Sequence, residues 1–544
     1  MLLALLFLNA IDAFVAACLA PLAIAAVVSG FDDLVLDVWL AMRRLRRRPA
    51  APPPLGSRQQ RIAVFVPLWQ EHAVIGSMLR HNLETIRYAN YDFFVGVYPN
   101  DAQTLDVVRE IEAESPGVHL TIVPHDGPTS KADCLNWIYQ GMLAHEEACG
   151  LHFDVVMTHD AEDVIHPESL QWINTYSEHC DMVQLPVLPL ATPGYRLTHG
   201  VYCDEFAEFQ TKDVPARKAL GGFLPSNGVG TGYTRRALEA LAASASNQVF
   251  DPTCLTEDYD CGIRLHRLGF RQLFVPICFQ DGAPVATREY FPQRFRQAVR
   301  QRTRWVIGIA LQGWERHGWR GGPSSVYWFW RDRKGLIGNP LSLFGNLICL
   351  YGLASLIGCR FSGRPWGLGE VTFTPVARLW LQAALLSQAF RLLVRAGCTA
   401  RIYGWAYAAG VPARAVAANW INAIATVLAI LRYAYARLSR QSHVWLKTAH
   451  TYPVFEGPLQ PEFPAIVAVD PSLVPRRVAR ALPAHIVERW RVLPFRVTAG
   501  SMTLATLEEP SAKLKRELSK FTRLEVEFQR VPPENFEQLK ARHL

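Results

Sequence analysis

The hydrophobic positions of the chain gather in long stretches at its start and in its second half. Residues 2–29 are almost wholly apolar, and residues 336–357 and 376–394 have the same character. Each stretch is long enough to form a helix that crosses a bilayer. We therefore predict three membrane-spanning helices.

The apolar stretch 411–435 differs from these three. It carries Arg414, Asn419 and Asn422, and basic residues flank it on both sides. These features favour an amphipathic helix that lies in the membrane interface over a fourth helix that crosses the bilayer. An interfacial helix keeps the C-terminal region in the cytoplasm.

Basic residues after the first apolar stretch set its orientation. Five arginines lie between residues 43 and 48, and no basic residue precedes the stretch. Because Lys and Arg mark the cytoplasmic flank of a membrane helix, we predict an uncleaved anchor, with the residues from 43 onward in the cytoplasm. Much of the net charge of +8 lies beside apolar stretches in this way, which argues for membrane topology and against nucleic-acid binding.

Between residues 58 and 321 the pattern changes to short buried strands that alternate with helices. A helix is predicted from Met78 to Ile86, and strands are predicted at Ile62–Pro67, Phe93–Tyr98, Leu120–Val123 and Phe153–Thr158. The alternation predicts an α/β fold with a parallel, doubly wound sheet. Ligands bind such sheets beyond the carboxyl ends of the strands.

Residues 461–544 have the pattern of a separate small α+β domain. Charged helices are predicted at Pro475–Ala481 and Pro510–Lys520, and β-rich runs lie between and after them. The predicted order along the chain is an anchor (1–42), a basic, proline-rich linker (43–57), the α/β domain (58–321), membrane and interfacial helices (322–440), a second linker (441–460) and the C-terminal domain (461–544).

Composition agrees with a membrane protein that faces the cytoplasm. Half of the 544 residues are hydrophobic, and only 19% are charged. The 11 cysteines include no C-x-x-C pair. Neither a disulfide framework nor a zinc site is indicated, and a reducing compartment fits this pattern.

The first candidate site follows the strand predicted at 153–158. Asp160, Glu162 and Asp163 lie just beyond its end. Hard oxygen ligands two residues apart suit Mg²⁺ or Mn²⁺, whose remaining positions a diphosphate can fill. The same acids would also suit a solvated turn that caps a helix.

A second acidic run, Thr256-Glu257-Asp258, begins a predicted helix. The carboxylate of Asp258, with Glu257 beside it, can accept the proton of a hydroxyl that attacks an anomeric carbon. The structural alternative is capping of the helix N-terminus, and both roles can coexist.

Gln301, Arg304 and Trp305 fall at positions i, i+3 and i+4, hence on one face of a helix. Arginine can bind pyrophosphate oxygens through two hydrogen bonds. Tryptophan offers a flat face for a sugar ring, and glutamine can bind a hydroxyl. An interfacial Trp/Arg anchor beside a membrane segment is the alternative.

Further candidates lie in predicted loops. Glu71 and Asp101 each follow a strand, where a nucleotide base or ribose can bind, and Lys131 can meet uracil or phosphate. A glycine-rich loop with Gly230 and Thr231 precedes a helix and is a candidate for acceptor binding. Each of these residues also suits an ordinary surface turn.

Taken together and in this order, the motifs resemble those of the processive, membrane-integrated family 2 glycosyltransferases, the group of the cellulose, chitin and hyaluronan synthases. The match covers residues 58–435, and the runs around Asp101, Lys131 and Asp160 resemble the bacteriophage adsorption protein B branch of that family. The motif departs from the wider family at Glu162, where aspartate is usual, which leaves open whether Glu162 or Asp163 contacts the metal.

The resemblance implies a GT-A fold, an inverting mechanism, and Mg²⁺ or Mn²⁺ as cofactor. It implies that Asp258 is the general base, and that Gln301, Arg304 and Trp305 hold the acceptor end and the diphosphate. The expected activity is processive transfer of a sugar from a UDP-linked donor to a polysaccharide at the bacterial inner membrane, with an outer-membrane export partner or a second copy of the chain. Single transfer to a polyprenyl phosphate and a non-catalytic receptor or secretion-scaffold subunit are the alternatives.

The C-terminal region resembles the N-terminal domain of type II secretion ATPases, which some bacterial proteins use to bind cyclic di-GMP. The resemblance rests on residues 481–510. The nucleotide-binding versions carry an R-L-G-x-x-L type motif, of which this sequence has no clean copy. The resemblance implies regulation of transfer by cyclic di-GMP.

Overall fold

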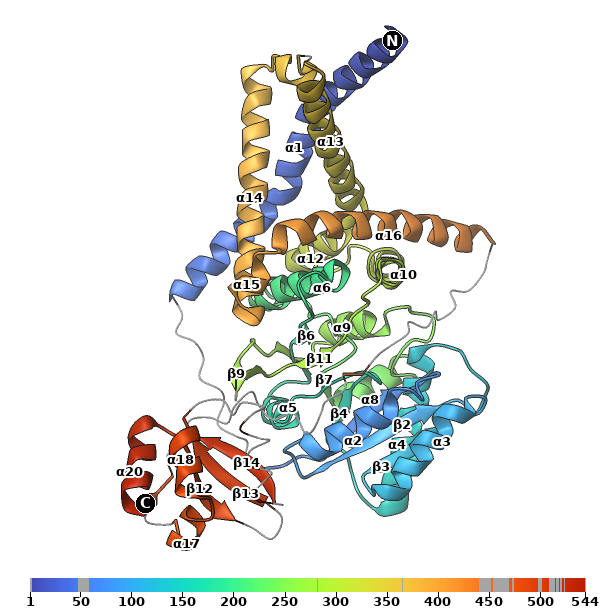
Figure 1. Cartoon of the computed structure of the whole chain (residues 1–544). Coiled ribbons are helices and arrows are strands. Elements are labelled where there is room, and N and C mark those ends of the chain that lie inside the picture. Colours follow the sequence, from blue (N-terminus) through green and yellow to red (C-terminus); the bar gives the residue numbers. More distant parts are fainter. Residues whose placement is uncertain are drawn as a thin grey trace. The chain divides into compact units, whose positions relative to one another are not determined.

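The computed structural model divides the chain into two compact units (Figure 1). One comprises Met1–Ile277 and Val285–Val454, and the other comprises Cys278–Pro284 and Phe455–Leu544. The predicted linkers 43–57 and 441–460 and the predicted helix Pro510–Lys520 lie largely outside the described residues. The structure describes residues 2–46, 58–280, 282–363, 365–439, 452–453, 469–471, 474–497, 501–507, 514, 518, 521–522 and 524–543.

A seven-stranded sheet with the order β3-β2-β1-β4-β7-β5-β8 forms the centre of the first unit. Its strands are β1 (Ile62–Pro67), β2 (Tyr91–Val97), β3 (Val118–Ile122), β4 (Val155–Thr158), β5 (Met182–Gln184), β7 (Thr231–Thr234) and β8 (Gln272–Phe274). A short parallel pair, β6 (Val187–Pro189) and β11 (Thr287–Glu289), lies outside this sheet.

The sheet is mixed, because β7 runs antiparallel to both of its neighbours, β4 and β5. The loop before β7 ends at the carboxyl edge, where the Gly230 amide donates to the Thr158 carbonyl at 2.9 Å. The chain therefore enters β7 from the end at which β4 finishes. The α/β fold and the first four strands were predicted correctly, whereas the prediction of a wholly parallel sheet is wrong at β7.

Helices cover both faces of the sheet, and alternate residues of β1 face opposite cores. Ile62, Val64 and Val66 belong to one buried cluster, and Ala63 and Phe65 to the other. The first cluster includes α2 (Ile75–Thr85), α3 (Ala102–Glu114) and α5 (Ser169–Ser177), and the second includes α4 (Lys131–Cys149), α8 (Arg235–Ala243) and α9 (Glu257–Arg267).

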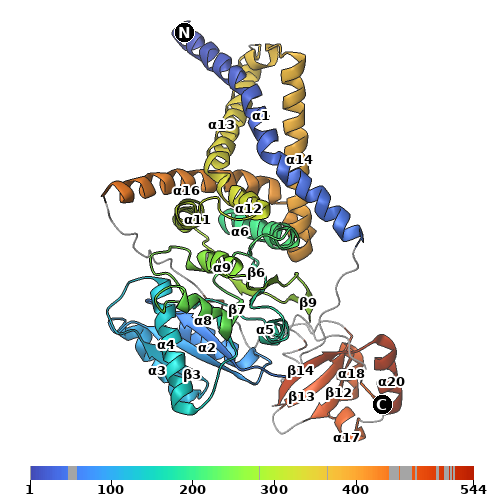
Figure 2. The same ribbon diagram turned by 180° about the vertical axis from the view of Figure 1, so that it is seen from behind.

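A layer of helices lies between the sheet and the long apolar helices (Figures 1 and 2). This layer contains α6 (Leu197–Glu208), η1 (Phe209–Asp213), α7 (Val214–Ala219), α10 (Phe295–Trp305), η2 (Val306–Gln312), α11 (Gly313–His317) and α12 (Pro323–Arg333). The remaining helices of this unit are α1 (Leu2–Arg46), α13 (Gly335–Ser362), η3 (Gly367–Glu370), α14 (Pro375–Tyr403), α15 (Trp405–Ala408) and α16 (Val411–Ser439).

Three helical segments of the described chain are long and apolar enough to cross a membrane, namely Asn9–Met42, Pro323–Ser362 and Val411–Ser439. The first two contain or overlap predicted spans. The predicted span 376–394 lies in α14, which is not among the three segments. The third segment is the helix predicted to be interfacial.

The α16 helix runs across the direction of α1, α13 and α14 (Figures 1 and 2). One face packs against α6 and α10 and buries Ile421 and Ala425, while Leu431 and Leu438 are exposed on the outside. This one-sided burial is typical of an amphipathic helix, and the interfacial position of α16 stays a prediction.

The second unit combines a three-stranded sheet with short helices around its own buried cluster. β13 pairs antiparallel with β12 and parallel with β14. Its elements are β9 (Phe279–Gln280), β10 (Ala283–Pro284), α17 (Arg476–Ala479), α18 (Ala484–Trp490), β12 (Val492–Val497), β13 (Ser501–Thr506), β14 (Glu525–Arg530) and α20 (Pro533–His543).

A buried ion pair joins α16 to α6, and it gives the first testable prediction. Nε and Nη2 of Arg414 donate to the two carboxylate oxygens of Asp204 at 2.7 and 2.9 Å, and both side chains are almost fully buried. Arg414→Leu leaves Asp204 buried without its cation, so we expect a loss of about 3–5 kcal/mol of stability. Thermal unfolding in detergent should show a lower midpoint.

The matched control is the double variant Asp204→Leu/Arg414→Leu, which removes both charges. We expect it to unfold at a higher temperature than the single variant, since no unpaired charge remains buried. Equal midpoints for the single and double variants would contradict this account of the ion pair.

Candidate active site

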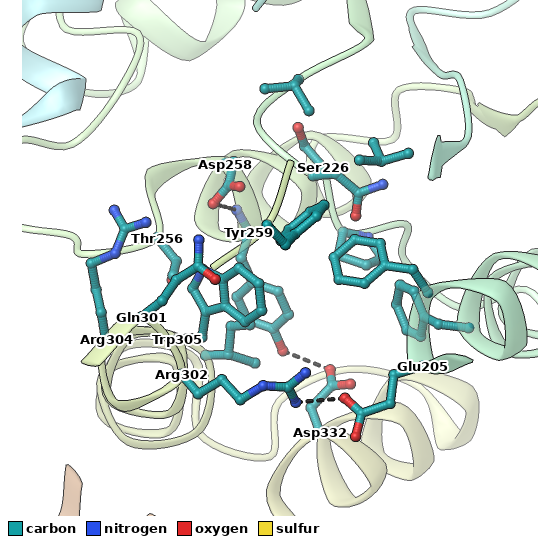
Figure 3. Close-up of a pocket in the computed structure, with 18 of the residues that line it drawn as sticks. Glu205, Ser226, Thr256, Asp258, Tyr259, Gln301, Arg302, Arg304, Trp305 and Asp332 are labelled. Carbon is teal, nitrogen blue, oxygen red and sulfur yellow. Dashed lines mark hydrogen bonds and ion pairs between the residues drawn. The ribbon is translucent and has the colours of Figure 1, made fainter. Parts of the chain in front are cut away.

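A cavity of about 590 Å³ lies at the carboxyl edge of the sheet, where side chains of the sheet loops face the helical layer (Figure 3). Asp101, Asp163, Gly230 and Thr231, although predicted as site residues, are not among its lining residues. The predicted residues that do line it are Glu71, Lys131, Asp160, Glu162, Glu257, Asp258, Gln301, Arg304 and Trp305.

The loop after β4 presents Asp160 and Glu162 to the cavity and keeps Asp163 inside the protein. Oδ2 of Asp163 accepts a hydrogen bond from the Asp160 amide at 2.9 Å and lies 2.7 Å from Nδ1 of the buried His159. Burial raises the pKa of Asp163. The expectation that Asp163 binds the metal is therefore corrected, because its carboxylate holds the loop that positions Asp160.

Lys131 faces this loop from the first turn of α4. The hydroxyl of Ser130 caps that helix by accepting a hydrogen bond from the Asp133 amide, so the helix starts at Lys131. Nζ of Lys131 lies 2.5 Å from Oδ1 of Asp160. Burial alone would lower the pKa of Lys131, but the carboxylates of Asp160, Glu257 and Asp258 raise it, so the ammonium stays charged.

Glu257 and Asp258 form the first turn of α9 and differ in access to the cavity. Glu257 is only 6% exposed, whereas Asp258 is partly exposed. Oδ1 of Asp258 accepts from the Tyr259 amide at 2.8 Å. Burial raises the pKa of both carboxyls, and Lys131 and Arg304 act in the opposite direction. Asp258 is therefore the better placed of the two to meet a ligand hydroxyl.

The α10 helix brings Gln301, Arg304 and Trp305 to the cavity on one side, as their spacing predicted (Figure 3). Trp305 packs with its ring centroid 6.1–6.4 Å from those of Tyr202, Phe206 and Phe291. Figure 3 shows all three predicted side chains on the face of α10 turned towards Asp258. The interfacial-anchor alternative for this motif is not supported, since these side chains line the cavity.

Glu71 and Asp101 lie in neighbouring loops but serve different ends. Asp101 is 6% exposed and caps α3, and its Oδ2 accepts from the Gln70 amide at 2.5 Å. The Glu71 amide donates to Oγ1 of Thr104 at 3.1 Å. The loop is thus tied to the start of α3, with Glu71 at the cavity and Asp101 behind it.

Gly230 and Thr231 lie behind the cavity wall. Thr231 is fully buried, and its hydroxyl donates to Oε1 of Gln184 at 2.7 Å. Gly230 has a φ of 60°, and a Cβ there would lie 2.4 Å from Oγ1 of Thr287. The expectation that these two residues contact the acceptor is corrected, because they pack the loop against the protein instead.

Sequence reasoning missed Arg302, although it lies inside the Gln301–Trp305 run. Its side chain points away from the other three (Figure 3), and Nη1 donates to Oε2 of Glu205 at 2.5 Å and to Oδ1 of Asn422 at 2.7 Å. The helical phase of position 302 already places it off the i, i+3, i+4 face. Arg302 therefore joins α10 to α6 and α16.

Part of the cavity wall is made of paired charges from α1, α6, η1, α12 and α14, which the sequence did not reveal. Arg331 lies 2.9 Å from a carboxylate oxygen of Asp33 and 2.6 Å from one of Asp213. Nε of Arg395 donates to Oε2 of Glu208 at 2.6 Å. In this wall the cations are matched by carboxylates of the protein, so its net charge is small.

Among the carboxylates that line the cavity, those of Asp160 and Glu162 lie together in the loop after β4 and could hold a divalent cation. The described residues contain no group of three or more His, Cys, Asp or Glu side chains arranged to hold a metal. Two protein oxygens suit Mg²⁺ or Mn²⁺ only if a ligand such as a diphosphate supplies others. The donor set therefore fits a metal that arrives with, or is completed by, a phosphorylated substrate.

Comparison with known proteins shows what the central part of the chain is similar to. Residues 59–308 match the family described as "Glycosyltransferase like family 2". The chain is 35% identical over 473 residues to "Bacteriophage adsorption protein B" of Escherichia coli K12, and equally so to "Bacteriophage N4 adsorption protein B" of Escherichia coli O157:H7. The alignment covers 80% of this chain, and the chain spans 62% of the length of these relatives.

Solved structures show weaker likeness. A mannosyltransferase from Pyrobaculum calidifontis in complex with GDP-Man and Mn²⁺ has a TM-score of 0.46 and 18% identity, covering 77% of this chain and 99% of its own. Glucosyl-3-phosphoglycerate synthase from Mycobacterium tuberculosis has a TM-score of 0.29 and 16% identity, covering 50% and 86%. Residues 59–308 are thus similar to family 2 glycosyltransferases, and the mixed α/β sheet with its carboxyl-edge cavity agrees with that match.

Proposed function

We propose that this protein transfers a sugar from a nucleotide-diphospho-sugar, UDP-linked, to the end of a growing polysaccharide at the bacterial inner membrane. The observation that carries the proposal is the position of Asp258. Its carboxylate faces the same cavity as Lys131, Asp160 and Arg304, so a base and a diphosphate-binding set of charges meet around one space. Transfer between a hydroxyl and an anomeric carbon requires both.

In the proposed reaction, Asp258 accepts the proton of the acceptor hydroxyl as that oxygen attacks the anomeric carbon. Burial raises the pKa of Asp258, which strengthens the carboxylate as a base. Lys131 and Arg304 stabilise the negative charge that builds up on the departing nucleotide diphosphate. Attack from the side opposite the leaving group inverts the anomeric centre.

Asp160 and Glu162 would hold a Mg²⁺ or Mn²⁺ ion, with Asp163 and His159 fixing the loop behind them. A bound metal of this kind supplies charge neutralisation for the leaving diphosphate. In this structure the ammonium group of Lys131 forms an ion pair with the carboxylate of Asp160. With donor bound, Lys131 would contact the phosphate oxygens and Asp160 would hold the cation.

The cavity favours a polysaccharide over a polyprenyl phosphate as acceptor. In the wall formed by α1, α6, η1, α12 and α14, Arg331 and Arg395 are already matched by carboxylates. A phosphate headgroup there would meet those carboxylates, whereas sugar hydroxyls can both donate to carboxylates and accept from guanidinium groups. Trp305 supplies a face for stacking. Repeated addition to the same chain is the processive form of this activity.

The membrane position rests on the apolar helices. Segments in α1 and in α12–α13 have the length and hydropathy of spans, and α16 has the one-sided burial of an interfacial helix. We propose that the catalytic domain and the C-terminal unit lie in the cytoplasm. So few spans suggest that an outer-membrane export partner or a second copy of the chain helps to pass the product outward, and a surface product agrees with the names of the two relatives.

The proposed activity is tested by offering radiolabelled nucleotide sugars, one at a time, to membranes that contain the protein. We expect one UDP-sugar to give product of more than one added sugar with Mg²⁺ or Mn²⁺ and none with EDTA.

Asp258→Asn should lower kcat by about 10²–10⁴-fold, because it removes the base but keeps the shape of the side chain. One sugar per lipid would support polyprenyl phosphate as acceptor, and full activity of Asp258→Asn would support a non-catalytic role.

The raised pKa of Asp258 predicts a pH profile. A general base acts only when deprotonated, so kcat/KM should fall about tenfold per pH unit below the pKa of this group. Because burial raises that pKa, the midpoint of the fall should lie above the ordinary aspartate value of 3.8. A profile without an acidic limb between that value and neutrality would exclude Asp258 as the base.

We also propose that the C-terminal unit regulates transfer by binding cyclic di-GMP. The support is the resemblance of this unit to secretion-ATPase domains, together with its separate buried core. Isothermal titration of the full-length protein with the dinucleotide should give saturable heat, and its addition should raise the rate of transfer. The matched control is cyclic di-AMP, which should give no saturable heat. The absence of heat with cyclic di-GMP at high concentration would contradict the proposal.

A further inference from the structure

The loop from Ser226 to Gly230 is the part of the cavity wall whose function the predicted motifs did not explain. Its backbone is held on several sides. The Asn227 amide donates to Oε1 of Gln184 at 2.9 Å, and Nε2 of Gln184 donates to the Val229 carbonyl at the same distance. The Gly228 amide donates to Oγ of Ser226 at 3.1 Å. A backbone fixed in this way fixes the directions of its side chains as well.

Gly228 brings this loop against the proposed base. It has a φ of 76°, and a Cβ added there would lie 2.7 Å from Oδ2 of Asp258. A glycine is needed both for that backbone conformation and for the space that the Asp258 carboxylate occupies. Asn227, the preceding residue, is therefore next to the reacting centre.

In this loop, the side-chain amide nitrogen of Asn227 has no hydrogen bond to any residue that the structure describes. Asn227 lines the cavity, yet its Nδ2 is buried from solvent and has no hydrogen-bond partner among the described residues. The hydroxyls of Ser226 and Thr231, in contrast, bond to one another at 2.9 Å. A buried donor left unbonded costs free energy unless a ligand satisfies it.

A second unused atom comes from α10. Oε1 of Gln301 is likewise buried, and no described residue donates to it. Gln301 lies on the face of α10 turned towards Asp258 (Figure 3). An unbonded donor, Nδ2 of Asn227, and an unbonded acceptor, Oε1 of Gln301, therefore come from two different elements that line the cavity with Asp258.

We propose that Nδ2 of Asn227 binds the terminal sugar of the acceptor, beside the already expected contact of Gln301, through a substituent next to the hydroxyl that Asp258 deprotonates. The chemistry fits hydroxyl or amide substituents, which can accept from Asn227 and donate to Gln301. Lys131, Asp160 and Arg304 already account for the diphosphate of the donor. Asn227 is in this sense a positioning residue for the acceptor, and the inference rests on the proposed function.

The test compares Asn227→Ala with the wild-type protein, using oligosaccharides from partial hydrolysis of the wild-type product as acceptor. Loss of one hydrogen bond to the acceptor should raise the KM for that oligosaccharide by about tenfold. The KM for the donor and the slow hydrolysis of donor without acceptor should stay within about twofold of wild type, because Asn227 does not touch the donor. Asn227→Ser, which keeps a donor group, should give an intermediate acceptor KM.

Asn90→Ala serves as the matched control, since Asn90 is a partly buried asparagine that does not line the cavity. A changed donor KM with an unchanged acceptor KM would place Asn227 at the donor and overturn the proposal. A lower unfolding temperature with equal losses in every parameter would show a structural role and overturn it as well. An active wild-type enzyme with unaltered acceptor KM in Asn227→Ala would sink this inference alone, whereas a wild-type protein without any transfer would sink the proposed function too.

Discussion

The balance of buried charge at the carboxyl edge of the sheet is the constraint on which the site depends. Asp160, Glu257 and Asp258 come from two elements, and all three act on the pKa of Lys131. Charged groups removed from water are costly unless opposite charges lie close by. The end of β4, the start of α4 and the start of α9 must therefore meet, and the first residue of α4 is what makes that meeting favourable.

The same constraint explains why Lys131 contacts Asp160 in this structure. Without ligand, the lysine is the nearest cation for the carboxylate, and the carboxylate is the nearest anion for the lysine. A diphosphate donor with a divalent cation would offer an anionic partner to Lys131 and a cationic partner to Asp160. The ion pair thus neutralises the charges of both groups, Lys131 and Asp160, which a ligand would otherwise have to balance.

Much of the site could be predicted because the end of a strand fixes a position in space. Asp160 follows β4, Lys131 begins α4, and Asp258 begins α9, so carboxyl-edge topology brought them together before any coordinates. Helical phase did the same for Trp305. The sequence could not say which side chain of a glycine-rich loop faces the cavity, since loop direction depends on tertiary hydrogen bonds. The sequence therefore predicted Thr231 as an acceptor-binding residue, whereas Asn227 lines the cavity and Thr231 does not.

Long-range pairing was equally hidden. The matching of Arg331 with Asp33 and Asp213 joins segments about 300 and 120 residues apart, and no local pattern announces it. The antiparallel direction of β7 was likewise not announced by any local sequence pattern. That direction depends on where the preceding loop delivers the chain, and that loop ends beside the last residue of β4.

The reversal of β7 also decides how the acceptor side of the site is built. A parallel β7 would start at the amino edge of the sheet, and the Ser226–Gly230 loop would then lie far from Asp258. Because β7 is antiparallel, the loop crosses the carboxyl edge and Gly228 can pack against that carboxylate. The proposed donor side follows from the parallel half of the sheet, and the proposed acceptor side follows from the antiparallel strand β7.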